Sequence, residues 1–161
     1  MVTVSEILKA FGEESVKIIQ TNMQKAGQNA TGETSQSITS EMPNKNQVQV
    51  TAPGYIYVLE TGRAPRKSTT RSDFNSKLEQ WIKAKNVNLQ LGKTIEQTTR
   101  SLQFLINKYG TKLYREGGRK DIITPIFEES RFDKLTTDIA NAEFNKVINV
   151  EDRDWETVAI L

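Results

Sequence analysis

At the centre of the chain stands the run Gly54-Tyr55-Ile56-Tyr57-Val58-Leu59-Glu60-Thr61-Gly62-Arg63-Ala64-Pro65-Arg66. It is the densest apolar and aromatic stretch of the protein, and it ends in one carboxylate, a glycine and two arginines. As a strand it would carry apolar side chains on both faces, which indicates burial on both sides. One or two turns of buried helix are equally compatible, because so short a run cannot be typed by its periodicity.

Glu60 closes this run at a point where we expect the chain to be still partly buried. A carboxylate in that position needs hydrogen bonds or a cation. Arg63 and Arg66 are the nearest candidates, and Gly62 permits a sharp exit from the element. We therefore interpret Glu60 as an anchor for Arg63 or for an arginine of a neighbouring copy. The alternative is an ordinary carboxylate in solvent at the end of a strand.

The composition is that of one globular domain of 161 residues, with 36% hydrophobic residues. The chain has no cysteine and no histidine. This excludes a disulfide scaffold, thiol or imidazole catalysis and a His/Cys zinc site, and it makes an enzyme less favoured. The first residues carry neither a basic segment nor a continuous apolar one, so no export signal is expected. No apolar run approaches bilayer length, and we expect no membrane partner.

The net charge of +2 conceals a strong asymmetry. Residues 63–120 contain 14 Lys or Arg and 4 Asp or Glu, a local net charge of +10, whereas the remainder has 8 and 16, a net of −8. Such a basic block can bind a polyanion or an acidic surface on another copy of the chain. Solvated helix faces are the simpler alternative.

Hydrophobic periodicity predicts an α+β fold with a small, mainly antiparallel sheet. We expect the sheet to be packed by an N-terminal helix, two middle helices and a C-terminal helix. The expected helices cover Val4–Lys25, Asp73–Lys85, Thr94–Lys108 and Ser130–Asn145. Strands are predicted at Thr34–Met42 and Gln47–Thr51, which form a hairpin around Pro43–Asn46, with a further strand possible at Asp121–Thr124. Residues 1–148 form the single domain, and 149–161 an acidic C-terminal tail.

Four short motifs, each of low specificity by itself, follow one another along the chain. Thr31-Gly32 precedes a Ser37-Ile38 strand, and a valine-rich strand then leads to Tyr55-x-Tyr57-Val58-x-Glu60-x-Gly62. Leu78-x-x-Trp81-Ile82-x-x-Lys85 and Ile106-Asn107-Lys108-Tyr109-Gly110-Thr111 follow. This order resembles the tail-completion, or head–tail joining, proteins of long-tailed phages over roughly Thr31 to Val147. Thr61 is inserted between Glu60 and Gly62, Arg63 replaces the family's usual threonine, and Glu33-Thr34 replaces an apolar residue after the Thr-Gly pair.

The resemblance implies a virion structural protein without catalytic residues, metal or cofactor. Such subunits form a ring, here expected to be six-fold or twelve-fold, at the junction of portal, neck and tail. The ring would join or terminate the tail and let DNA pass through its lumen. Its partners would be other copies, neck, portal-side and tail-tube proteins, and DNA bound without sequence preference. The protein would reside in the virion, and in the host cytoplasm during assembly.

Two contact hypotheses follow from the residues. The acidic tail would dock on the neighbouring copy or on the next ring, because buried tryptophan often dominates interfaces; its anchors would be Trp155, Ile160 and Leu161. A frayed terminus is the alternative. Basic residues in two loops would contact phosphates in the lumen or a neighbouring subunit; they are Arg63, Arg66, Lys67, Arg71, Arg115, Arg119 and Lys120. The competing function is a nonspecific nucleic-acid-binding accessory protein, which would be a salt-sensitive monomer.

Overall fold

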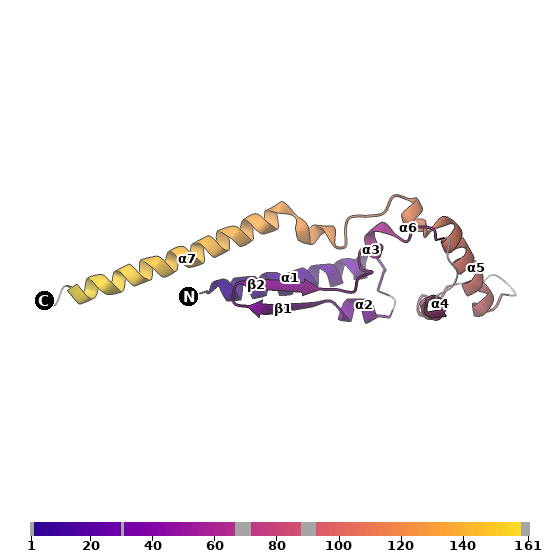
Figure 1. Cartoon of the computed structure of the whole chain (residues 1–161), viewed down its shortest axis with the longest axis horizontal. Coiled ribbons are helices and arrows are strands. Elements are labelled where there is room, and N and C mark those ends of the chain that lie inside the picture. Colours follow the sequence, from indigo (N-terminus) through magenta and orange to yellow (C-terminus); the bar gives the residue numbers. More distant parts are fainter. Residues whose placement is uncertain (1, 30, 67–71, 88–92, 159–161) are drawn as a thin grey trace.

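The computed structural model describes residues 2–29, 31–66, 72–87 and 93–158, and the side chains of these residues except 72–73 and 149–158. The molecule is elongated and belongs to the expected α+β class, with one two-stranded antiparallel sheet among many helices (Figure 1). Helix α1, Val4–Lys25, and the hairpin form the middle of the molecule. Helix α7, Glu129–Val158, extends from one end. The other end is occupied by helices α4, Ser72–Ala84, α5, Ile95–Tyr109, and α6, Lys112–Arg115.

Helix α1 covers Val4–Lys25, which confirms the expected bounds. Its start is fixed by a capping box in which the Thr3 hydroxyl accepts the N–H of Glu6 while the Glu6 carboxylate accepts the N–H of Thr3. Two of the unpaired N–H groups of the first turn are thereby satisfied. The buried face of α1 includes Ile19 and Met23, which form the main core with Ile38, Ile122 and Ile126.

The hairpin consists of β1, Thr39–Asn44, and β2, Gln47–Thr51. Val48 and Val50 are half-buried, as their alternation with polar residues predicts. The first strand begins five residues later than expected, because Glu33–Gln36 forms the short helix α2. The pairing ends at Thr39 opposite Thr51, after which the partner strand reaches Ala52 and Pro53. Residues before Thr39 therefore have no strand to pair with.

Gly12 lies in α1 where the hairpin packs against the helix. A Cβ atom there would lie 2.2 Å from Ser40 Oγ and 2.4 Å from Val48 Cγ2. A mid-helix glycine lowers helix stability by about 1 kcal/mol relative to alanine. In return, the absence of a side chain allows the helix and the sheet to come into close contact. The glycine is a packing requirement of the α1–hairpin interface.

The central run is not a strand. Residues 54–57 form turns and Val58–Thr61 forms the short helix α3, so the helical alternative is correct. Ile56 and Leu59 pack against the core, whereas Tyr55 is 45% exposed and Tyr57 61% exposed. The prediction that both faces of this run are buried is therefore wrong, because a helical turn places the apolar residues on one side and the tyrosine rings on the other. Gly62 ends the helix with φ +72°.

Helices α4, Ser72–Ala84, and α5, Ile95–Tyr109, pack against each other through Leu78, Ile82 and Thr99 among others. They lie at the far end of the molecule from the hairpin, so they extend the fold and do not cover the sheet (Figure 1). Thr94 and Gln97 form a second capping box at the start of α5. Helix α6, Lys112–Arg115, contains Arg115, which the sequence predicts to lie in a basic loop.

The segment after α6 enters the core without forming the expected strand. Residues 121–123 make bends, and Thr124–Phe127 is the 3-10 helix η1 with Pro125 in its first turn. Helix α7 then runs over Glu129–Val158, through the expected end at Asn145 and into the residues assigned to a tail. It packs beside α1, where the rings of Phe11 and Phe132 are 5.7 Å apart, and projects beyond the N-terminal end of α1 (Figure 1).

Candidate functional site

The surface of the molecule is unusually large and apolar for a chain of this size. It exposes 11939 Å², whereas a compact monomer of 18.2 kDa exposes roughly 8,100 Å². Among the described residues, 13 large hydrophobic side chains are exposed and 8 hydrophobic side chains are buried. Large exposed apolar surface marks interaction sites. We therefore treat the exposed apolar faces at the two ends as the candidate functional site.

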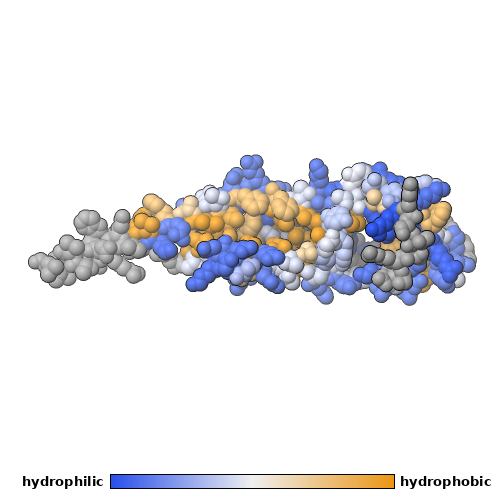
Figure 2. Space-filling model, in the orientation of Figure 1, coloured by the Kyte–Doolittle hydropathy of each residue, from blue (hydrophilic) through white to orange (hydrophobic). Residues whose placement is uncertain are grey.

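The first of these surfaces lies on α7. Phe144 is 64% exposed, Val147 56% and Ile148 39%, and we call these three residues the distal α7 face. Their spacing of three and four places them on one side of a helix. Figure 2 shows hydrophobic residues gathered along the half of the molecule formed by α1 and α7, while much of the visible surface at the other end is hydrophilic. The distal α7 face begins twelve positions after Phe132, whose ring packs against Phe11 of α1.

The second surface is an open hollow of about 230 Å³ at the opposite end, lined by Leu105, Tyr109, Gly110 and Arg115. We call it the α5–α6 hollow. Leu105 and Tyr109 are each 47% exposed. The ammonium group of Lys108 lies 5.0 Å from the ring centre of Tyr109, so a cation borders the apolar lining. Apolar walls with cationic edges suit an apolar partner that carries negative charge.

The charge asymmetry of the sequence becomes a spatial one. The basic block, residues 63–120, contains α4, α5 and α6, and these helices form one end of the molecule. Helix α7 has 8 acidic and 4 basic residues over Glu129–Val158, a net charge of −4. The two ends of the elongated chain therefore carry opposite charge, which favours contact between unlike ends of two copies.

The structure divides the predicted basic contacts into three groups. Arg63 and Arg119 are engaged within the chain: the Arg63 guanidinium lies 4.0 Å from the ring centre of Phe74, and Arg119 is ion-paired with Asp121. Exposed cations remain at Arg66, Arg115 and Lys120. Lys67 and Arg71 lie outside the described residues. The side chain of Trp155 and the residues Ile160 and Leu161 also lie outside them, so the docking of the tail remains a prediction.

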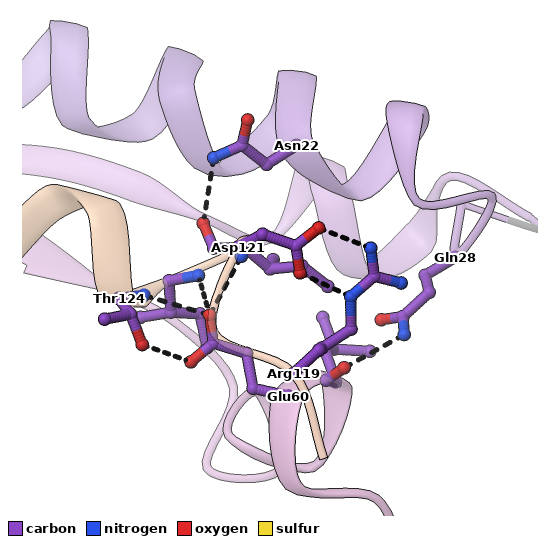
Figure 3. A network of polar contacts seen from close by, with 9 residues as sticks. Asn22, Gln28, Glu60, Arg119, Asp121 and Thr124 are labelled. Carbon is purple, nitrogen blue, oxygen red and sulfur yellow. Dashed lines mark hydrogen bonds and ion pairs between the residues drawn. The ribbon is translucent and has the colours of Figure 1, made fainter. Parts of the chain in front are cut away.

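Glu60 is an anchor, but its partners are not the expected arginines (Figure 3). Its Oε1 accepts the backbone N–H groups of Ile122, Ile123 and Thr124 at 2.8, 2.7 and 3.0 Å, and Oε2 accepts the Thr124 hydroxyl at 2.8 Å. The turn into η1 points three consecutive N–H groups at one place, and such a set binds an anion well. We call this arrangement the Glu60 clamp.

Further contacts around the clamp join three segments that are distant in sequence. The Arg119 N–H donates to the Glu60 carbonyl at 2.8 Å, Asn22 of α1 donates to the carbonyl of Ile122, and Gln28 donates to the carbonyl of Leu59 (Figure 3). Burial alone would raise the pKa of Glu60, but the N–H groups and the Thr124 hydroxyl together hold it below 4.5. The clamp is therefore ionised at neutral pH and has a structural role.

A weak signal for each feature that was not predicted is present in the sequence. Thr124-Pro125 is a typical helix start, and it identifies a turn with free N–H groups near a buried carboxylate. On α5, Phe104 and Leu105 are exposed, whereas Thr99 is buried and Ile106 is half-buried. Apolar residues around more than half of a helix indicate a second contact face.

No group of carboxylates in the described part of the chain could hold a metal ion, and none of its helices is long and apolar enough to cross a membrane. The chain matches no family model, and it is significantly similar to none of the curated proteins or solved structures compared with it. A functional proposal for this protein therefore rests on the geometry of the molecule itself.

Proposed function

We propose that the protein is a virion structural subunit that assembles into a ring at the head–tail junction of a phage, where it joins or terminates the tail and allows DNA to pass. The observation that carries this proposal is the surface of 11939 Å² on an 18.2 kDa chain. A surface that exceeds that of a compact monomer by on the order of 3,800 Å² is suited to burial between subunits. The ordered motifs that resemble the tail-completion proteins support the location.

The shape of the subunit supports a ring in particular. Its two ends differ in charge and in apolar residues, so unlike ends attract and like ends repel. Contacts between unlike ends are heterologous, and they close into a ring when the rotation between copies allows it. A mechanical role needs no catalytic group, which is consistent with a chain that has neither cysteine nor histidine.

DNA contact forms a secondary part of the proposal. Arg66, Arg115 and Lys120 are exposed and lie in or beside loops, from which they can reach phosphates without reading bases. Binding of this kind is nonspecific and falls steeply with salt. The alternative function, a monomeric nucleic-acid-binding accessory protein, accounts for these cations, but it leaves the exposed apolar residues of α7 without a role.

The test uses the full-length chain and the particles that contain it. Native mass spectrometry and negative-stain images of the purified protein should show closed rings with a channel wide enough for duplex DNA. Particles made without the protein should have filled heads and unattached or unterminated tails. A monomer at all concentrations that binds DNA in a salt-sensitive manner would favour the alternative function.

A further inference from the structure

The structure assigns a specific partner to each end of the molecule. We infer that the distal α7 face of one copy docks into the α5–α6 hollow of the next copy. The inference rests on the proposed function for the existence of an assembly, but it names the contact that holds the assembly together. The partner of each surface is a second copy of this chain.

The contact has to be intermolecular. The distal α7 face and the α5–α6 hollow lie at opposite ends of the elongated molecule (Figure 1). Between them stand α1, the hairpin and α3, so one chain cannot bring its own two surfaces together without unfolding. When the same two surfaces meet between copies, the contact is heterologous and every subunit uses both of them.

Size and chemistry favour this occupant. Phe144, Val147 and Ile148 present adjacent apolar side chains on a rod, and the hollow has apolar walls of Leu105 and Tyr109 with a volume of about 230 Å³. That volume is enough for a few side chains and too small for a whole folded element. The contact is therefore a helix edge that enters a shallow receptor, a common mode of helix recognition.

Charge disfavours the most obvious competitor, a contact between two α7 helices. Two α7 helices that pack side by side would each bring a net charge of −4 over Glu129–Val158. The block with the hollow has a net charge of +10 over residues 63–120, and the exposed Arg115 lies in its lining. Repulsion between like surfaces costs affinity, and attraction between unlike ones selects the partner. The α7 rod thus prefers the basic end of a neighbour to another α7.

Disulfide trapping tests the contact directly, because the chain contains no cysteine. Purified Ile148→Cys and Leu105→Cys proteins are mixed and oxidised, and the products are separated by mass under denaturing conditions. We expect a mixed disulfide dimer of the two variants. The matched control pair is Thr39→Cys with Gln80→Cys, because both residues are exposed and lie outside the two surfaces. This pair should give at least tenfold less mixed dimer.

A second variant measures the contribution of the interface. Phe144→Ser should weaken self-association on the order of thirtyfold, as expected for a buried aromatic anchor. Phe127→Ser removes a ring that is equally exposed, at 65%, outside both surfaces, and should leave self-association unchanged. Both variants should keep the circular dichroism spectrum of the unmodified protein, because each replaces a side chain that is mostly in solvent.

Several outcomes would overturn the inference. In the trapping experiment, they are a mixed dimer no more abundant than in the control pair, or an Ile148→Cys homodimer as the main product. In the association measurements, they are equal effects of Phe144→Ser and Phe127→Ser, or a protein that stays monomeric. The virion location is judged separately, by detection of the protein in purified particles. Its failure there, with the mixed disulfide formed, would reject the proposed function and leave the contact intact.

Discussion

Replacement of Glu60 by glutamine tests whether the clamp holds the fold together. The substitution keeps the shape of the side chain but removes the charge that accepts three N–H groups and one hydroxyl at 2.7–3.0 Å. A hydrogen bond to a charged acceptor contributes about 1.5–3 kcal/mol, and one to a neutral acceptor about 1 kcal/mol. Because Thr124 is exposed and water can partly replace its bonds, we expect the free energy of unfolding to fall by about 2–3 kcal/mol.

The assay is urea unfolding followed by circular dichroism at neutral pH, at one fixed protein concentration so that association is constant. With a slope of about 1–3 kcal/mol per molar urea, the midpoint should fall by about 0.7–3 M. Glu13→Gln is the matched control, because that carboxylate is exposed and lies 3.9 Å from Lys9 in a surface ion pair. Such pairs contribute about 0–1 kcal/mol.

The clamp also predicts a pH dependence with a definite sign. The pKa of Glu60 is held below its ordinary value of 4.5 in the folded state, so the native protein binds fewer protons than the unfolded chain in that region. The stability from the clamp is fully present above pH 4.5 and is lost as the pH falls through the lowered folded-state pKa. Glu60→Gln should flatten this part of the profile, and Glu13→Gln should not. Equal midpoints for the two variants, or an unchanged acid profile, would refute the role of the charge.

Three further outcomes are expected. Gly12→Ala should lower the free energy of unfolding by about 1–3 kcal/mol in urea titrations, because its Cβ would overlap Ser40 and Val48. Gly54→Ala, whose Cβ would meet nothing within 4 Å, should change it by less than about 0.5 kcal/mol. Truncation after Val150 should reduce assembly measured by sedimentation, since the acidic tail is proposed to dock on the neighbour; unchanged assembly would count against that role. DNA binding to the assembled protein should fall steeply between low and physiological salt in filter-binding assays, and a ring that binds no DNA at low salt would reject the lumen contacts.

Local patterns were sufficient to predict the elements that pack by a regular face. Helix α1 shows the 3.6-residue period over Val4–Lys25, and β2 alternates strictly over Gln47–Thr51, so each places one apolar face against the other. The expected helix Thr94–Lys108 agrees with α5, Ile95–Tyr109, to within one residue at each end. These predictions succeeded because the relevant interactions lie within a few residues along the chain.

The central run and the Glu60 clamp could not be predicted in the same way. Five consecutive apolar residues are equally compatible with a buried strand and with a short helix. Which of the two forms depends on the elements that pack beside them. The partners of Glu60 come from residues 122–124, more than sixty positions later, as backbone N–H groups. Backbone donors carry no signature in the sequence, whereas arginine does, and for this reason the nearby arginines were the wrong candidates.

The clamp lies where the two ends of the molecule are joined. The chain crosses this junction twice, and the crossings are tied together: the Arg66 N–H donates to the carbonyl of Asn107, the Thr111 N–H to the carbonyl of Arg63, and the Arg119 N–H to the carbonyl of Glu60. A subunit that is held by neighbours at both ends transmits any load through this junction. Many bonds of roughly 1 kcal/mol that act together resist such a load better than one apolar contact, because they are directional and break cooperatively. Loss of the Glu60 charge should therefore weaken assembly as well as folding, even though Glu60 lies outside both proposed contact surfaces.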